Sequence, residues 1–281
     1  PYTTLFRSEI NELIEINPAK RFSGFGVILD ATRGQRIKSQ AIEYCTQIKI
    51  IDKSLNPIVD IDKNYAKKYI TLFIYWNQDE FQPFVHKIGD IIRFYNFEFE
   101  LYNGYLQGKN RKNSTWKIYH GDSQINEPYA HSSDSKEKAT QLHVSKLGEL
   151  REWTRLFFDE HSLMDMDWYS MDRQLNNPST LQSFDMLLRV EEVRASEDAI
   201  NESILVVFVD DQFKRYRLKQ HRLHMTFLRA GDIVKVRSIE RIENDVLVGH
   251  SKYNAILTIP PYFLDCKKFK EAIKIIEDQR S

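Results

Sequence analysis

Apolar and polar residues alternate along most of the chain with a period of two, the pattern of half-buried β-strands. In the N-terminal half, three such runs precede a Gly89-Asp90 turn, at residues 26–32, 43–52 and 69–76. A fourth strand follows that turn and meets the hairpin signal Asn103-Gly104, after which we expect a fifth. A short segment, 79–85, fits a helical insert after the third strand.

The C-terminal half repeats this plan. HKIGDIIRF at 86–94 is answered by LRAGDIVKV at 228–236, and each copy leads into a long strand. The remaining expected elements of the second copy are strands at 183–193, 204–209, 214–218 and 245–259, with an intervening piece at 221–229. Five short strands with an insert after the third predict a Greek-key barrel of the oligonucleotide/oligosaccharide-binding (OB) type in each half. An SH3-like barrel or a split sandwich would give a similar string.

Two segments show the three-and-four spacing of amphipathic helices. The first, 146–161, has apolar residues at Leu147, Leu150, Trp153, Leu156 and Phe157. The second, 263–279, has Phe263, Phe269, Ile273 and Ile276 on one side. Because residues 132–138 are polar and aperiodic, we expect a first barrel over 1–131, a linker over 132–145, and a second barrel with bridging and C-terminal helices over 146–281. The predicted fold is mainly β, with two tandem OB-fold barrels.

Strand parity predicts which side chains of the two Gly-Asp strands face outward. In the first strand, we expect core positions at Tyr95, Phe97, Phe99 and Leu101. That alternation leaves Tyr102 exposed beside the Asn-Gly turn. In the second strand, we expect Val234 and Val236 to point inward and Lys235 and Arg237 to point outward as a cationic pair.

Composition is that of a globular chain: among 281 residues, 42% are hydrophobic and 28% charged. Forty basic and forty acidic residues cancel, so an anionic partner must be held by a local basic stripe. Two cysteines fit neither a disulfide scaffold nor a zinc ribbon, which favours a reducing compartment. No apolar run reaches the roughly 18 residues of a membrane helix, so we expect a soluble protein without a membrane partner. The chain lacks an initiator Met, so we expect that a segment preceded it.

Catalytic patterns are weak. The carboxylate pairs Asp60/Asp62, Asp165/Asp167 and Asp210/Asp211 fit solvated turns. His221 and His224 have no Cys or Glu at a metal-binding spacing, and Gly24-Phe25-Gly26 lacks the third glycine of a dinucleotide fingerprint. We therefore expect no enzyme, no cofactor and no metal site.

Two segments without acidic residues interleave cations with aromatic rings, which suits unpaired nucleic acid because bases stack on rings while phosphates need charge. In 101–121, the cations are Lys109, Arg111, Lys112 and Lys117, interleaved with Tyr102, Tyr105, Trp116 and Tyr119. In 212–230, the basic residues are Lys214, Arg215, Arg217, Lys219, Arg222 and Arg229. A solvated basic face is the alternative interpretation of both segments.

The ordered runs VILDAT at 27–32, Tyr44 with IKIID at 48–52, TLFIY at 71–75, GDIIR at 89–93 and LYNG at 101–104 resemble the ciliate telomere end-binding protein alpha subunits. The second half is similar through LREW at 150–153, Phe184-Asp185, GDIVKVRS at 231–238, and Gly249-His250 with Tyr253-Asn254. The protection-of-telomeres proteins of other eukaryotes are similar too. The resemblance covers nearly the whole chain.

The resemblance implies a non-enzymatic nuclear protein whose tandem barrels bind a G-rich single-stranded telomeric overhang, cap it, and regulate the access of telomerase. It implies stacking on Tyr102 and further contacts from Tyr44, Lys49, Asp185, Lys235, Arg237, His250 and Tyr253. The family's third barrel, which contacts a partner subunit, is missing here, so the chain resembles the DNA-binding half of a longer protein.

Two stretches depart from the family pattern. The loop 105–116 is shorter than the family's, and 194–202 lacks the family's hairpin aromatic. Three alternatives stay open: a general single-stranded DNA-binding protein of the replication-protein type, a protein-interaction module of a telomere or telomerase complex, and an enzyme whose barrels only dock substrate.

Overall fold

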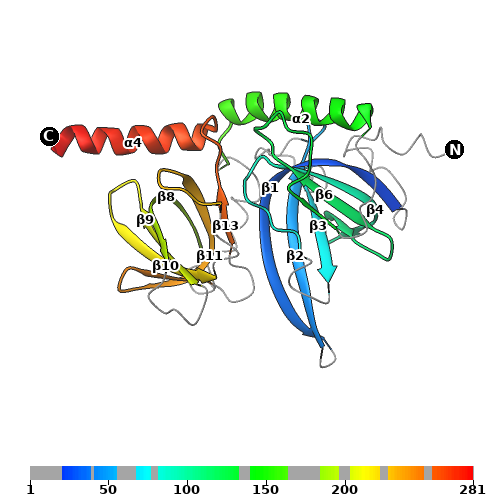
Figure 1. The fold of residues 1–281 in the computed structure, drawn as a ribbon, viewed down its shortest axis with the longest axis horizontal. Coiled ribbons are helices and arrows are strands. Elements are labelled where there is room, and N and C mark those ends of the chain that lie inside the picture. The colour runs from blue at the N-terminus through cyan, green and yellow to red at the C-terminus, as the bar shows by residue number, and fades with distance from the viewer. Residues whose placement is uncertain are drawn as a thin grey trace.

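The computed structural model places two β-barrels side by side, with β13 between them (Figure 1). It describes residues 21–38, 41–55, 68–76, 82–132, 140–163, 184–195, 203–221, 227–249 and 255–280. Within these residues, no helix has both the length and the apolar composition that a membrane span requires. The mainly β prediction is confirmed.

The first barrel is built from a seven-stranded sheet. Its strands are β1 (Arg21–Lys38), β2 (Ala41–Ile51), β3 (Ile70–Trp76), β4 (Ile91–Tyr102), β5 (Tyr105–Lys109), β6 (Thr115–Tyr119) and β7 (Ala130–His131). The sheet order is β1-β2-β3-β5-β4-β6-β7, and a further β1–β4 pairing closes the first five strands into a barrel. The β3–β5 pairing is parallel, whereas the other pairings are antiparallel. β6 and β7, which extend the sheet from β4, were not predicted.

The second barrel repeats this topology. Its strands are β8 (Phe184–Ala195), β9 (Ser203–Val209), β10 (Arg215–His221), β11 (Ile233–Glu243), β12 (Val246–Gly249) and β13 (Ala255–Thr258). The sheet order is β12-β10-β9-β8-β11-β13, closed by β12–β11, and β10–β12 is the parallel pair. The single strand predicted at 245–259 is wrong: β12 completes the barrel, while β13 pairs on the other edge of β11. Each half thus closes five strands in OB order, as predicted.

The repeated Gly-Asp turns are equivalent in space as well as in sequence. The Gly89 N–H donates to the Ile28 carbonyl oxygen at 2.8 Å, and the Ile28 N–H donates to that of Asp90 at 2.7 Å. In the second barrel, Gly231 and Asp232 make the same two bonds to Val190, both at 2.8 Å. Both glycines have φ near +90°, at 88° and 92°, a region that side chains rarely adopt.

The bridging helix α2 (Gln141–Glu160) begins five residues before the predicted start at 146, inside the predicted linker. The reason is a capping box: the Thr140 hydroxyl accepts from the His143 N–H at 3.4 Å, and His143 Nδ1 accepts from the Thr140 N–H at 3.2 Å. Leu147 and Leu150 are fully buried in the core of the first barrel. This helix therefore packs on the first barrel, although the predicted boundaries grouped it with the second.

The predicted apolar face of α2 is wrong at one position. Leu156 is 59% exposed, whereas Phe158 is buried and stacks on Phe263, with ring centroids 4.2 Å apart. Phe158 faces inward because it lies four residues after Thr154 and eight after Leu150, so these buried residues share one face of the helix. Its ring partner, Phe263, directly precedes α4 (Leu264–Arg280).

The C-terminal helix α4 was predicted within one residue at each end. Phe263, Phe269 and Ile273 are buried as expected, and they belong to the same cluster as the first-barrel core. Asp265 fastens the helix start to the end of α2, because its carboxylate accepts from the Ser162 hydroxyl at 2.8 Å and the Leu163 N–H at 2.9 Å. One hydrophobic cluster thus runs from the first barrel through the junction to α4.

Parity along β4 differs from the prediction because Asn96 interrupts the strand. Asn96 has φ of 59°, and the β1–β4 register shifts between Phe22 and Gly24. Tyr95, which precedes this irregularity, is 37% exposed, while Phe97 and Phe99 are buried as predicted. Leu101 is 60% exposed because it lies at the hairpin end, beyond the core.

Candidate nucleic-acid interface

One outer sheet face of the first barrel collects aromatic and basic side chains. Lys49 lies opposite Thr71 in the β2–β3 register, and Phe73 is paired in register with Lys109 on β5. Because residues that are paired in register share a face, these strands present one surface, which we call the first-barrel face. Its members used below are Lys49, Phe73, Tyr75, Tyr102, Tyr105 and Lys109.

Aromatic rings line this face. The Phe73 and Tyr75 rings lie nearly parallel, with centroids 6.4 Å apart and an interplanar angle of 12°. Tyr102 is 58% exposed at the β4–β5 hairpin, directly opposite Tyr105, so the predicted exposed tyrosine is confirmed. Half-buried or exposed rings on an OB sheet are suitable platforms for unpaired bases.

Phe73 and Tyr75 are not among the site residues that the sequence predicted. Their signal was the alternation in β3, where Ile70, Leu72 and Ile74 are fully buried and the intervening positions point outward. Large aromatic rings at outward positions of a strand whose inner face is aliphatic indicate a ligand-binding surface.

Two of the predicted cations at the end of this face, Lys109 and Arg111, are already paired. Lys109 forms an ion pair with Glu100, and Arg111 binds Glu98 through two hydrogen bonds of 3.0 Å each. The hydrogen bond from Arg111 lowers the pKa of the Glu98 carboxyl. Lys112 lies exposed in the turn after β5. A phosphate that binds here must compete with two carboxylates.

Lys49 and Tyr44 lie on opposite faces of β2. Lys49 points onto the first-barrel face, with its ammonium 5.2 Å from the centroid of the Tyr69 ring. Tyr44 is five residues away in an unbroken register and pairs with Trp76 on the other face. The two candidates therefore do not share one ligand surface on β2.

Lys235 and Arg237 do not face solvent, so their predicted exposure is wrong. Both point away from the second-barrel core, but there they meet β1 of the first barrel. The Lys235 ammonium, fully buried, lies 3.4 Å from Asp30 and 3.1 Å from Asp185. Arg237 forms an ion pair with Asp30, and burial lowers its pKa to about 10.

Asp185 completes this cluster, which we call the junction cluster: Asp30, Asp185, Lys235 and Arg237. One Asp185 oxygen accepts from the Ser238 N–H at 2.9 Å, and the other faces Lys235. Two carboxylates and two cations balance, as buried charges require. Asp30 also lies opposite Lys49 in the β1–β2 register, so the cluster borders the first-barrel face.

A basic row lies on the outer side of the second barrel. Arg215, Arg217 and Lys219 alternate along β10 and are exposed, while Tyr216 and Leu218 between them are buried. We call this row the second-barrel face. The sequence RYRLK at 215–219 already shows this alternation of basic and other residues. It lies within the predicted basic segment 212–230, but its residues were not among the predicted DNA contacts. The remaining candidates, His250 and Tyr253, lie outside the described residues.

Of the three acidic pairs, the structure describes Asp210/Asp211, which lies at a turn. Asp210 Oδ1 accepts from the Gln212 and Lys214 N–H groups at 2.9 and 2.8 Å, as expected of a turn. The pairs Asp60/Asp62 and Asp165/Asp167, and His224, lie outside the described residues.

A carboxylate–imidazole group forms elsewhere in the first barrel. Ligand atoms of Asp90, His120 and Asp122 lie within 4.8 Å of one another. Both Asp90 oxygens already accept hydrogen bonds, from the Gly121 N–H at 3.0 Å and the Tyr129 hydroxyl at 2.8 Å. Lys87 pairs with Asp122 at 2.7 Å, and these protein partners account for the group without a metal.

Two closed five-stranded barrels, each with a ligand-accessible sheet face, define a tandem OB-fold protein. A family model described as telomeric single-stranded DNA-binding POT1/CDC13 matches residues 7–163, more than half of the chain. The chain belongs to this family.

Relatives of the chain are telomere-binding proteins of ciliates. The telomere-binding protein subunit alpha of Stylonychia mytilus is 27% identical over 295 residues, covering 95% of this chain and 57% of the relative. That of Sterkiella nova is 27% identical over 275 residues, covering 92% and 53%. The chain thus spans little more than half of these relatives. Fission yeast Pot1, solved with ssDNA, is 11% identical, with a TM-score of 0.41, over 95% of this chain and 93% of that one.

Proposed function

We propose that this chain binds single-stranded, G-rich telomeric DNA and caps the 3′ overhang without enzymatic activity. The observation that carries the proposal is the first-barrel face, where rings and cations share one sheet surface in a member of the telomeric single-stranded DNA-binding family. In the cell, the chain acts in the nucleus at chromosome ends. Regulation of the access of telomerase, and contact with a partner subunit, are further parts of this proposal.

The proposed mode of binding follows from the two faces. Bases stack on the rings of the first-barrel face, each stack contributing about 1–3 kcal/mol. Phosphates replace Glu98 and Glu100 as partners of Arg111 and Lys109. The strand continues to the exposed cations of β10, which supply sequence-independent attraction.

The remaining candidate residues have unequal support. Tyr102, Lys49 and Lys109 lie on the first-barrel face, with Arg111 and Lys112 at its end, and we assign them to the interface. Lys235, Arg237 and Asp185 are assigned to holding the barrels together, because their charges are matched among themselves and with Asp30.

A competition assay tests the proposal. The chain is titrated with a G-rich telomeric repeat, its complement and a scrambled strand at one salt concentration. We expect preference for the G-rich strand, and weaker binding by Tyr75→Ala, while Leu156→Ala on the exposed side of α2 serves as the control. Equal affinity for all three strands would favour a general single-stranded DNA-binding protein, and no binding would favour a protein-interaction module.

A further inference from the structure

Tyr75 lies near the end of β3, beyond the last residue pair that this strand forms with β5. The parallel register between the two strands ends at the pair Phe73↔Lys109. One further backbone bond follows, from the Asn110 N–H to the Phe73 carbonyl oxygen at 3.2 Å. The chain then turns away from the sheet, so the β5 ladder ends before it reaches Tyr75.

The side chain of Asn110 takes the place of the missing strand partner. Its Oδ1 accepts from the Tyr75 N–H at 2.8 Å, and its Nδ2 donates to the Tyr75 carbonyl oxygen at 3.0 Å. A neighbouring strand would offer Tyr75 the same combination of one acceptor and one donor. A primary amide carries both groups, so Asn110 extends the ladder to Tyr75 although the strand itself has ended.

The turn that follows Asn110 is fastened to β4. The Arg111 N–H donates to the Ser114 hydroxyl oxygen at 2.8 Å, and the Ser114 N–H donates to the Arg111 carbonyl oxygen at 2.9 Å. The Ser114 hydroxyl in turn donates to the Asn96 carbonyl oxygen on β4 at 2.6 Å. Because these bonds hold the turn, the Asn110 amide is fixed in place in the absence of DNA.

The contact from Asn110 determines how the ring pair of the first-barrel face is held. The Phe73 and Tyr75 rings are nearly parallel, and their centroids are 6.4 Å apart. This distance is close to the rise of two residues along an extended strand, about 6.4–6.8 Å. The rings therefore keep the spacing of the strand, which requires β3 to remain extended as far as Tyr75. Strand ends open more easily than strand centres, and the two bonds from Asn110 restrain this end.

The residue after Asn110 connects the ring pair to a cation. Arg111 lies at the end of the first-barrel face, where it binds Glu98 through two hydrogen bonds. Consecutive residues thus hold a ring for a base and a guanidinium for a phosphate. Each nucleotide of a strand carries both groups, so a fixed distance between the two partners favours its binding.

We propose that Asn110 is a positioning residue of the first-barrel face: its amide holds Tyr75 so that the ring pair is in place before a base stacks on it. The proposal rests on the proposed function, because the position of Tyr75 matters only if its ring contacts DNA. Without the amide, the end of β3 opens and DNA binding must order the Tyr75 ring. Ordering one side chain corresponds to an about two- to tenfold loss of affinity.

The test is a double-mutant cycle on the intact chain, with a G-rich telomeric repeat as the probe. Asn110→Ala should weaken binding about two- to tenfold, and Tyr75→Ala about fivefold or more. The variant with both substitutions should bind no more weakly than Tyr75→Ala alone, because Asn110 acts through that ring. Asn110→Ala should leave the salt dependence of binding unchanged, since no cation is lost. Gln124→Ala removes an exposed amide between β6 and β7 and should bind like the wild type.

Hydrogen exchange without DNA tests the same contact directly. The Tyr75 amide should exchange faster in Asn110→Ala, while that of Leu72, in the buried part of β3, should not change. If Asn110→Ala does not fold in circular dichroism, Asn110→Asp replaces it. Asp keeps the oxygen that accepts from the Tyr75 N–H and loses the donor to the Tyr75 carbonyl, and the cycle cancels the effect of its charge.

Three results would overturn the role of Asn110 and leave the proposed function standing. Asn110→Ala could bind as tightly as the wild type, or the Tyr75 amide could exchange at the wild-type rate. The losses of the two single variants could also multiply in the double variant, which would mean that Asn110 acts independently of the Tyr75 ring. If the wild type binds no strand, the proposed function fails, and the role of Asn110 in DNA binding fails with it.

Discussion

Replacing Lys235 with Met separates two roles for this residue, which the sequence predicted to be an exposed DNA contact and the structure places in the junction cluster. The side chain is fully buried, with carboxylates of Asp30 at 3.4 Å and Asp185 at 3.1 Å. Met keeps the unbranched stem and removes the charge. The variant therefore leaves packing largely intact and unbalances the junction cluster by one negative charge.

The size of the effect follows from what remains. Asp30 keeps Arg237 as its partner, and the Asp185 side chain is 19% exposed, so it keeps some contact with water. Removing one partner of a buried pair costs about 3–5 kcal/mol, and the remaining partners place this case near 3 kcal/mol. At roughly 2–4 °C per kcal/mol, the thermal midpoint should fall by about 6–12 °C. Asp30→Asn should cost more, because it leaves two buried cations with one carboxylate.

Two measurements on the same variant decide between the roles. Thermal or urea denaturation gives the free energy of unfolding. Affinity for a single strand, measured at several salt concentrations, gives the salt slope, which is the steepness with which the logarithm of the binding constant falls with the logarithm of the salt concentration. We expect the slope to stay unchanged in Lys235→Met, since no phosphate contact is lost. Lys219→Met, exposed on β10, is the control and should lower the slope by about 0.7 with little change in stability.

The reverse pattern would refute this reasoning. If Lys235→Met lowered the salt slope by about 0.7 and left the free energy of unfolding unchanged, Lys235 would contact a phosphate, and the junction cluster would not exist in solution.

Three further outcomes are expected. Tyr102→Ala should weaken strand binding by about 1–3 kcal/mol in a titration, with an unchanged midpoint of unfolding because the side chain is 58% exposed; a drop in that midpoint would indicate a core residue. Glu98→Gln should free Arg111 and so raise both affinity and the salt slope; weaker binding would mean that Glu98 itself contacts the DNA. Burial raises the pKa of Asp90 from 3.8 to about 7, so between these values the folded state binds more protons, and the free energy of unfolding falls as pH rises. Asp90→Asn should make this decrease smaller in denaturation curves recorded from about pH 4 to 7. The lowered pKa of His86 makes the free energy of unfolding rise with pH over the same range, but it does so equally in the wild type and the variant.

Much of the fold was predictable because local signals agree with the tertiary structure. The two Gly-Asp turns need glycines with positive φ, and the same short motif occurs in both halves, so the repeat and both barrels could be predicted from the sequence. The start of α2 was missed because apolar spacing says nothing about a capping box at Thr140. Tyr95 was predicted to point inward, but it is exposed because Asn96 has a positive φ and shifts the alternation of the strand. Asn adopts this conformation in some places and not in others, so the sequence alone does not show where it occurs.

Residues of the candidate site were predictable only where the alternation along a single strand determines whether a side chain is exposed. Tyr102 follows from parity beside a hairpin, and the cations of β10 follow from alternation with buried residues. The pairing of Arg111 with Glu98 joins residues 13 positions apart across a strand register that the sequence does not state. Charges in an acid-free segment therefore looked unmatched although their partners lie on the neighbouring strand.

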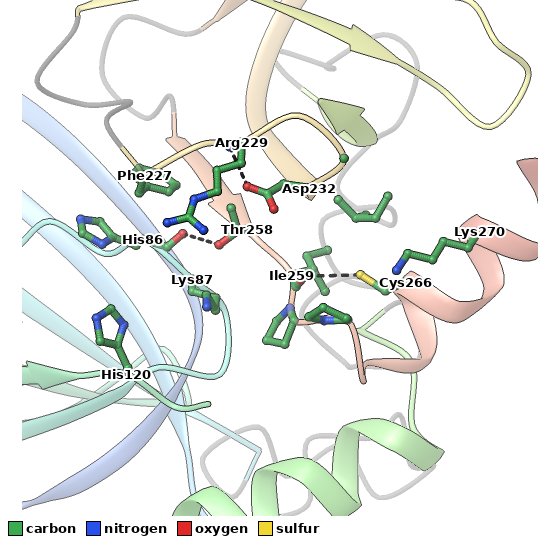
Figure 2. A pocket seen from close by; sticks show the side chains of 14 residues that line it. His86, Lys87, His120, Phe227, Arg229, Asp232, Thr258, Ile259, Cys266 and Lys270 are labelled. Carbon is green, nitrogen blue, oxygen red and sulfur yellow. Dashed lines mark hydrogen bonds between the residues drawn. The ribbon is translucent and has the colours of Figure 1, made fainter. Parts of the chain in front are cut away.

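The error at Lys235 has a more general cause. Parity separates the inside of a barrel from its outside, and it does so correctly for Val234, Val236 and Lys235. In a single barrel, side chains that point away from the core face solvent. In a tandem pair, some of these side chains face the other barrel instead. The carboxylate that covers Lys235 is Asp30, 205 residues away in sequence and inside a run that reads as an ordinary first strand. A buried lysine with its own carboxylates is thus evidence that the barrels are joined rigidly. That rigidity is why Lys87 and Arg229, each two residues before the glycine of a Gly-Asp turn, can line one cavity of about 330 Å³ between the barrels (Figure 2).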